Sequence, residues 1–306
     1  MLGTIGNILN IILFRKRNLW KLSPSISFLL AASISNMVNI YSYVIFRVLV
    51  GFKITTTSYS IVCKLQVYLN YISICCSSWF MVGCCIDRFF SSSRSATIRS
   101  YSNMRIATRM IIMINIIIIL VYAEVLYCYD ANQSNKASQC FVQNEVCNIV
   151  DIVLFFILQA LGPPLLMLIF GIGTFIHIRQ RKKFEQRSKV ALGAVVETII
   201  STTTTRNSRK NDQEILYMLI IQVSLYIICS MPLFLMKIYS IATLLTIKSA
   251  EQLSIENLLL NIAIFLSMID KIFSFYIYTL SSTYYRKELI QFFNLCRSQR
   301  RVTPLN

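Results

Sequence analysis

The chain has 306 residues, of which 56% are hydrophobic and only 14% are charged, and its mean hydropathy is +0.61. Soluble domains carry roughly one quarter charged residues, so this composition excludes a water-facing globular surface. The net charge of +17 would suit nucleic acid if the basic residues formed one face. They are confined to the connections between apolar runs instead, so we expect no nucleic-acid partner.

Apolar runs and polar connections alternate along the chain. A helix needs about 20 apolar residues to cross a hydrocarbon core of about 30 Å. A short run, 1–14, comes first, and the runs that reach full length are 26–46, 61–86, 110–129, 149–176, 215–235 and 258–280. Each run should be helical, because unpaired backbone amides are too costly in lipid. The sequence therefore predicts an all-α bundle of seven transmembrane helices.

The first run covers only about two thirds of the membrane at about 1.5 Å per residue. It ends in Arg15-Lys16-Arg17 and lacks a basic leader and a small-residue cleavage site, which argues against a signal peptide. Two explanations stay open: translation begins upstream, or this is a shortened copy whose first helix does not reach the outer surface.

The basic residues predict the orientation. Most of them follow the first, third, fifth and seventh runs, as Lys21, Arg94, Arg187 and Arg297 illustrate. The positive-inside rule makes that side cytoplasmic, so we expect a multi-pass plasma-membrane protein with its N-terminus outside and its C-terminus in the cytoplasm. The alternative for most of these residues is a solvated loop that contacts anionic headgroups.

Four cysteines fall at or beyond the outer ends of the predicted helices, where disulfides persist: Cys63, Cys128, Cys140 and Cys147. Four cysteines allow three pairings. A bridge from Cys63 to Cys140 would pin the long outer loop over the bundle. The same loop carries Asn132-Gln133-Ser134, an N-glycosylation acceptor pattern that agrees with the orientation.

Several motifs occur in a fixed order along the chain. Cys63 precedes Asp87-Arg88-Phe89 at the end of the third run. The other motifs are Gly6-Asn7, Pro163 or Pro164, Cys229-Ser230-Met231-Pro232, and Tyr278 followed by Tyr285-Arg286. In this order and spacing the chain resembles the rhodopsin-like (class A) G-protein-coupled receptors, from Gly6 to about Arg301. The chain departs from the family at two positions that serve the family's activation switch. Ser230 replaces the tryptophan of the sixth helix, and Ser274-Phe275 replaces the Asn-Pro of the seventh.

The resemblance implies a switch at the cytoplasmic end. Arg88, beside Asp87, would pair with Asp212 in the idle state, and release would follow as the sixth helix swings about Pro232. Tyr278 would mark the end of the seventh helix. The alternative is that Arg88 only caps the boundary and reaches to headgroups.

The resemblance also implies a polar core. Asn36 stands where the family places a sodium-binding aspartate, Ser77 matches another sodium position, and Asp270 falls where a neutral polar residue is usual. The acid is then expected to have moved across the bundle. The alternatives are that Asp270 pairs with Lys271 or is held protonated by desolvation.

The resemblance mainly argues against certain classes of ligand. Asn70 replaces the aspartate of amine receptors, and Met268 replaces the lysine that holds retinal, which disfavours a biogenic amine and a photopigment. A basic, amide-rich mouth of Lys64, Gln66, Asn70, Arg47 and Lys237 suggests a peptide ligand, with Gln66, Asn70 and Lys237 as contacts. Side chains that merely reach to the outer interface are the alternative.

Beyond the seventh run, Tyr285, Leu289, Phe292 and Phe293 repeat at helical spacing and predict a short interfacial helix. Cys296 could be palmitoylated there. The expected division is a receptor domain over 1–296, whose first helix is truncated at its outer end, and a basic cytoplasmic tail over 297–306.

The sequence thus predicts a receptor that converts binding of an extracellular, neuropeptide-like ligand into activation of a heterotrimeric G protein. It predicts no enzyme, cofactor or metal site, since there is one histidine and no pair of intramembrane acids or metal-binding cluster. The alternatives are a membrane transporter or channel, which would use odd polar residues such as Glu124, and a degenerate receptor that no longer couples.

Overall fold

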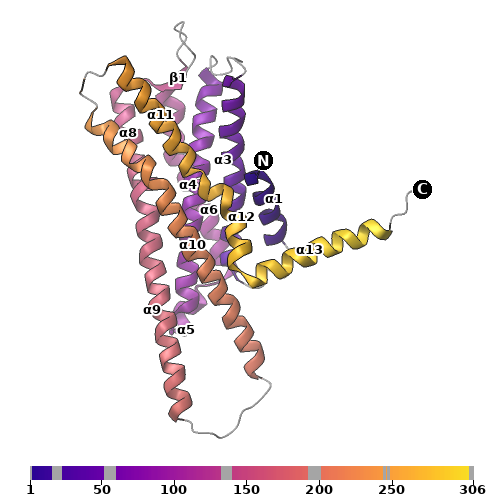
Figure 1. The fold of residues 1–306 in the computed structure, drawn as a ribbon. Helices are drawn as coiled ribbons and strands as arrows, with labels where there is room; N and C mark the ends of the chain where they lie inside the picture. The colour runs from indigo at the N-terminus through magenta and orange to yellow at the C-terminus, as the bar shows by residue number, and fades with distance from the viewer. Residues whose placement is uncertain are drawn as a thin grey trace.

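The computed structural model describes residues 2–15, 23–51, 60–131, 140–191, 201–243, 246 and 249–302. Long helices lie side by side along one common direction (Figure 1). The helices of this bundle are α1 (Leu2–Phe14), α3 (Ser25–Gly51), α4 (Ser60–Ser92), α6 (Met104–Val121), α8 (Glu145–Phe155), α9 (Gly162–Ala191), α10 (Ser201–Ala242), α11 (Ala250–Ser267) and α12 (Ile269–Ser281). Apart from Tyr129 at the end of one run and Met268 between α11 and α12, every predicted apolar run is helical in its described part, so the all-α prediction is confirmed.

The helices extend beyond the apolar runs because polar residues continue them outside the hydrocarbon layer. Within the described residues, five stretches are long and apolar enough to cross a membrane: Ser60–Ser92, Met104–Cys128, Glu145–Gln180, Tyr217–Ala242 and Ala250–Ser281. Two further helices complete the bundle. The shorter apolar helix α1 packs against α3 and α12, and α3 packs against α4.

Two of the membrane stretches change helix type partway. The α6 helix passes through a 3₁₀ turn, η2 (Tyr122–Glu124), into α7 (Val125–Cys128), and α8 is joined to α9 by a π-helical segment, η3 (Phe156–Leu161). The π segment lies directly before Pro163 and Pro164, which have no amide proton for an upstream carbonyl. The α10 helix, by contrast, continues through Pro232.

The carbonyls freed around η3 bind neighbouring helices. The Gln159 carbonyl accepts a hydrogen bond from the Tyr226 hydroxyl at 3.0 Å, and the Leu158 carbonyl accepts one from Trp79 Nε1 at 2.9 Å. A lost intrahelical bond is thereby replaced by bonds from α10 and α4, which fixes these helices against the π segment.

Glycines allow the closest helix contacts. A Cβ on Gly83 of α4 would lie 2.5 Å from Cε1 of Phe28 on α3, and one on Gly6 of α1 would lie 2.9 Å from Cβ of Phe275 on α12. Beside Gly6, the fully buried Asn7 donates to the Lys271 carbonyl at 3.1 Å. Small residues and interhelical hydrogen bonds are the usual means of helix association in lipid.

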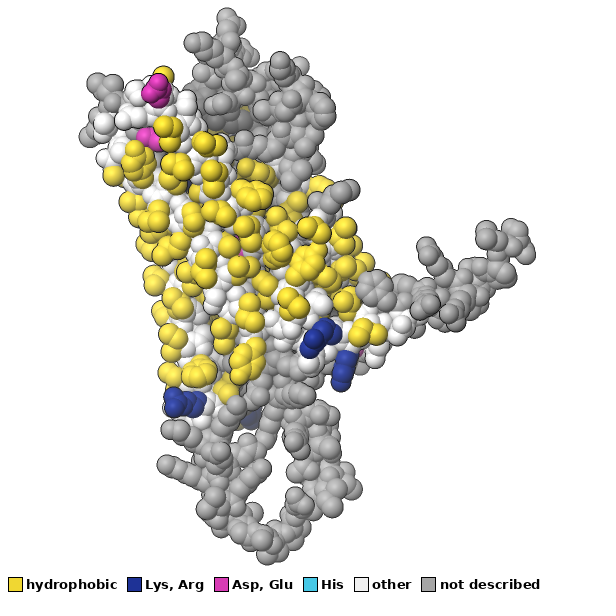
Figure 2. Space-filling view, in the orientation of Figure 1, with side chains coloured by type: hydrophobic (Ala, Val, Ile, Leu, Met, Phe, Trp, Pro, Cys, Tyr) yellow, Lys and Arg dark blue, Asp and Glu magenta, His cyan; other side chains and the backbone are white. Residues whose placement is uncertain are grey.

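The outside of the bundle suits a bilayer. Figure 2 shows hydrophobic side chains over the middle of the visible face, with Lys and Arg toward its lower end and acids at its upper end. Large exposed apolar residues lie on most helices, for example Leu120, Ile169, Ile228 and Phe265. Such a surface would be unusual on a soluble monomer.

The two ends of the bundle carry smaller elements. At the end predicted to lie outside, β1 (Tyr129–Ala131) and β2 (Cys140–Val142) pair antiparallel, with Ala131 opposite Cys140. At the other end, α5 (Ala96–Ser100) connects α4 to α6, and α13 (Thr283–Val302) leaves the bundle crosswise (Figure 1). The predicted interfacial helix is therefore present. It runs to Val302, so the expected boundary at residue 296 falls inside α13.

Candidate functional site: a helical bundle with polar residues at both ends

The end of the bundle that is predicted to be cytoplasmic is built around Asp87 and Arg88, near the end of α4. Both are buried, with 6% and 4% of their surface exposed. Arg88 Nε donates to Ser25 Oγ at 2.6 Å, a terminal nitrogen of Arg88 donates to Ser23, and a terminal nitrogen lies 3.6 Å from Asp87. The arginine is therefore held by an acid and two hydroxyls at the start of α3.

Asp87 extends this network to a third segment. Its carboxylate accepts hydrogen bonds from the Ser25 hydroxyl and, at 2.7 Å, from the Ser102 hydroxyl in the turn before α6. A buried ion pair is stable only when its remaining hydrogen-bonding capacity is met, and these serines provide that. The sequence interpretation missed Ser23, Ser25 and Ser102, since serines in polar connections give no distinct signal.

The rest of this end joins α4 to α9. Phe89 stacks on the His177 ring at a centroid distance of 4.8 Å, and Arg94 donates to the Gln180 carbonyl at 2.6 Å. The predicted partner Asp212 lies on α10, but its side chain is outside the described residues, so the Arg88 latch stays a prediction.

In the core, the predicted polar residues come together. Asn36, Ser77 and Asp270 line one small cavity of about 10 Å³, and Ser77 donates to Asn36 at 2.6 Å. Lys271 Nζ lies 3.1 Å from Asp270 Oδ1, and both side chains are buried. This ion pair corresponds to the alternative in which Asp270 pairs with Lys271 instead of binding sodium. The Asp270 charge is already compensated and the cavity has room for about one water, so the residues do not fit an additional sodium ion.

The outer half holds a larger, mostly apolar cavity of about 220 Å³ between α4, the π segment, α10 and α12. Its polar lining residues are Tyr71, Gln159, Ser230, Ser267 and Lys271. Ser230 lies there in place of the bulky tryptophan that the resemblance would suggest. Aromatic residues such as Tyr122, Phe155 and Phe234 also line the cavity.

The predicted mouth residues have partners of their own. Asn70 accepts a hydrogen bond from Asn39 at 2.7 Å, and Lys237 lies 3.8 Å from Asp151. Hydrogen bonds from the Ser60 side chain and the Ala131 amide, and to a smaller degree the charge of Lys64, lower the pKa of the Asp130 carboxyl. The two described lysines of the mouth thus face acids. Gln66 is half-buried one turn outward from Asn70, while the Arg47 side chain is outside the described residues.

Asp151 is the outer-half residue that the sequence interpretation missed. It lies on α8, is 3% exposed, and accepts a hydrogen bond at 3.2 Å from Tyr71, whose hydroxyl also lies 3.2 Å from that of Tyr129. One signal was present in the sequence: Asp151 interrupts the apolar run 149–176 two residues after its start.

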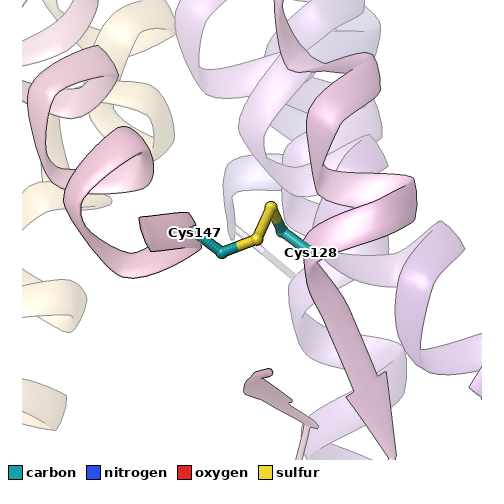
Figure 3. The surroundings of a disulfide bond; sticks show 2 residues. All are labelled: Cys128 and Cys147. Carbon is teal, nitrogen blue, oxygen red and sulfur yellow. A yellow bond between two sulfur atoms is a disulfide. The ribbon is translucent and has the colours of Figure 1, made fainter. Parts of the chain in front are cut away.

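A disulfide joins Cys128 at the end of α7 to Cys147 in the first turns of α8 (Figure 3). The two cysteines are 19 residues apart in the sequence. In the chain-entropy model, a closed loop of this length stabilises the folded state by about 3 kcal/mol. Cys63 is also disulfide-bonded, to a partner outside the described side chains. Cys75, Cys76, Cys84, Cys85 and Cys229 are free and buried, as expected of cysteines in apolar runs.

Other predicted residues cannot be placed in the site. Asn132 and the side chains of Cys140 and Cys296 are outside the described residues. Pro232 is described, inside α10. Tyr278 is 2% exposed and packs on Phe14 and Tyr285, so the end of α12 is tied to α1 and α13 by aromatic contacts.

Comparison with known proteins agrees with this geometry. Residues 6–278 match the family described as 7 transmembrane receptor (rhodopsin family). Among solved structures, squid rhodopsin superposes with a TM-score of 0.75 at 16% sequence identity, over 96% of this chain and 82% of that chain. At that identity the likeness shows the fold alone. No curated protein matches the chain.

Proposed function

Because the chain belongs to the rhodopsin family of seven-transmembrane receptors, we propose that it converts binding of an extracellular peptide into activation of a heterotrimeric G protein. Family membership supports a multi-pass membrane receptor that couples to G proteins, and members of this family are receptors rather than enzymes. The peptide ligand and the outside position of the N-terminus are our proposals.

The buried Asp87–Arg88 network is the observation that carries this proposal. A charge pair held at the cytoplasmic end by three serines from two other segments is costly unless it serves a second state, since apolar residues would pack there at no such cost. In that second state Arg88 leaves its partners and the inner ends of α4 and α10 separate. Asp212 on α10 is the proposed counterpart of Arg88 in the idle state, and Pro232 is the proposed pivot.

The outer cavity is the proposed ligand site. Gln66 and Asn70 lie one turn apart on α4, above Tyr71, and offer amide groups to a peptide's carbonyls. Lys237 completes the proposed contacts. The bond between Cys128 and Cys147 leaves Cys140 as the remaining outer cysteine for Cys63, and β1 packs against α4, which supports that pairing. We further propose glycosylation at Asn132 and palmitoylation at Cys296.

The receptor proposal is tested with the purified chain reconstituted in nanodiscs with heterotrimeric G proteins, and guanine-nucleotide exchange is measured. We expect basal exchange above that of empty nanodiscs. Asp212→Asn should raise it by about fivefold, the effect of losing an ion pair worth about 1 kcal/mol in the idle state. Arg88→Gln should return it to the empty-disc rate.

The exposed Arg109→Gln, at the start of α6, is the matched control and should leave exchange unchanged. Exchange no faster than in empty nanodiscs would contradict coupling and favour the degenerate receptor. Wild-type rates for Asp212→Asn would remove the latch. A screen of short amidated peptides with the same readout tests the ligand class, and ion flux without any G protein would favour the channel alternative.

A further inference from the structure

Among the described side chains, Asp151, Glu124 and Lys237 form a group near the cavity with two acids and one base. Asp151 of α8 lies near Glu124 of η2, close enough for their charges to interact. Lys237 Nζ lies 3.8 Å from Asp151 Oδ2 and 5.4 Å above the centre of the Phe155 ring. One lysine balances one carboxylate, so the group of three side chains carries one uncompensated negative charge when both acids are ionised.

Three carboxylate oxygens of this group lack hydrogen bonds. Oδ1 of Asp151 and both oxygens of Glu124 are buried and have no hydrogen-bond partner among the described residues. Asp151 itself is 3% exposed, so solvent does not replace the missing partner. Unpaired charge at membrane depth costs several kcal/mol and marks a functional site unless a partner arrives.

The acids and the apolar cavity share their walls. Tyr71 donates to Asp151 and lines the cavity, and Phe155 lies one turn inward from Asp151 and also lines it. Tyr122, which also lines the cavity, lies in the same 3₁₀ turn as Glu124, two residues before it. A group that enters the cavity of about 220 Å³ therefore meets aromatic rings along its body, and one of the lining residues, Tyr71, contacts Asp151 directly.

We infer that the ligand carries a protonated amine or guanidinium group that binds between Asp151 and Glu124, with an apolar or aromatic part in the cavity below. This inference rests on the proposed receptor function for its biological meaning, and it deepens it by naming the ligand's charge. It differs from the basic, amide-rich mouth expected from sequence, because Lys237 is already paired with Asp151. The cation comes from a small amine or from a basic side chain of a peptide.

The test measures binding to the purified full chain in nanodiscs without any G protein, by calorimetry and by thermal unfolding. Two probes carry one cation each: phenethylammonium chloride and the acetylated, amidated dipeptide Phe-Lys. Their neutral counterparts are 2-phenylethanol and the same dipeptide with norleucine in place of lysine. We expect a cation to bind more tightly than its neutral counterpart by roughly tenfold or more, as for hydrogen bonds to charged groups. Tighter binding of phenethylammonium would identify the ligand as a small amine, and tighter binding of the dipeptide would identify it as a peptide with a basic side chain.

Glu124→Gln is the decisive variant, since Glu124 has no hydrogen bond in the described structure whose loss would unfold the chain. It should weaken cation binding by roughly tenfold. Asp130→Asn removes an acid from the same outer end, in β1, whose contacts are Ser60, Gln143 and Lys64, and should leave binding unchanged. Asp151→Asn should weaken binding as well, with its fold checked by thermal unfolding.

The inference fails if no cation binds the wild-type chain, if neutral probes bind as tightly as cations, or if Glu124→Gln binds cations like the wild type. These outcomes are separate from a failure of the receptor proposal. A chain that exchanges nucleotide but ignores cations refutes only the inference, and one that binds cations without supporting exchange refutes only the coupling.

Discussion

Single polar side chains hold the helices of this bundle together at defined points. Tyr226, on α10, is 4% exposed, and its hydroxyl donates to the Gln159 carbonyl, which lacks its usual amide partner because residue 163 is proline. Asn7 makes a comparable bond from α1 to α12. In lipid no water is available to replace such bonds, so each fixes one helix position.

Removal of the Tyr226 hydroxyl should destabilise the bundle. We expect Tyr226→Phe to lower the free energy of unfolding by about 1 kcal/mol, because the Gln159 carbonyl loses its donor while the ring stays in place. Thermal unfolding of the purified chain measures this. Tyr217→Phe, on the same helix but 62% exposed, is the control and should unfold like the wild type. Equal unfolding temperatures for both variants would mean that the carbonyl finds another partner.

At the residue scale, motif spacing predicted part of the site. Asn36, Ser77 and Asp270 line one cavity as expected, since the family resemblance assigns them facing positions. Ser25, Ser102 and Asp151 were not predicted. Their importance comes from neighbours that lie far away in the sequence, and a lone serine or aspartate at a helix end is common in any membrane protein.

Helices approach most closely where a side chain is missing. The α3–α4 contact places the Phe28 ring directly over Gly83, whereas Gly171 on α9 has no heavy atom within 4 Å of its ideal Cβ position. The two glycines therefore differ only in what covers them, which makes them a matched pair.

Substitution by alanine should have opposite effects at the two positions. Gly171→Ala should stabilise the chain by up to about 1 kcal/mol, because alanine favours the helix and meets open space. Gly83→Ala should destabilise it by about 1–3 kcal/mol, since the new methyl group overlaps Phe28. Thermal unfolding of both variants in the same detergent measures the difference. A stabilised Gly83→Ala would show that Phe28 moves aside without cost.

At the element scale, hydropathy predicted a helix for each apolar run, because the length of such a run is set by the bilayer, although the last membrane stretch begins at Ala250, eight residues before the predicted run. It did not predict the 3₁₀ turn at η2 or the π segment η3. Both depend on hydrogen bonds from other helices that substitute for intrahelical ones, such as the bonds of Trp79 and Tyr226 around η3. The sequence shows the paired prolines Pro163 and Pro164 after η3, but it did not predict that the helix before them would be π-helical.

Across the whole molecule, the two polar ends have different chemistry. Among described side chains, exposed bases such as Arg99, Arg105 and Arg179 lie at the end of Arg88, while Asp151 and Glu124 lie at the opposite end, around the outer cavity. An apolar band separates the two ends (Figure 2). The proposed receptor would bind its ligand at the acidic end and the G protein at the basic end.

The account depends on this bundle crossing the membrane with the Cys63 end outside and the Arg88 end inside. A short epitope tag inserted between β1 and β2, and separately one between α9 and α10, tests this on intact cells with a membrane-impermeant antibody. We predict that the β1–β2 tag is labelled without permeabilisation and that the α9–α10 tag is labelled only after it. Labelling of both tags on intact cells, or of the α9–α10 tag alone, would contradict the account.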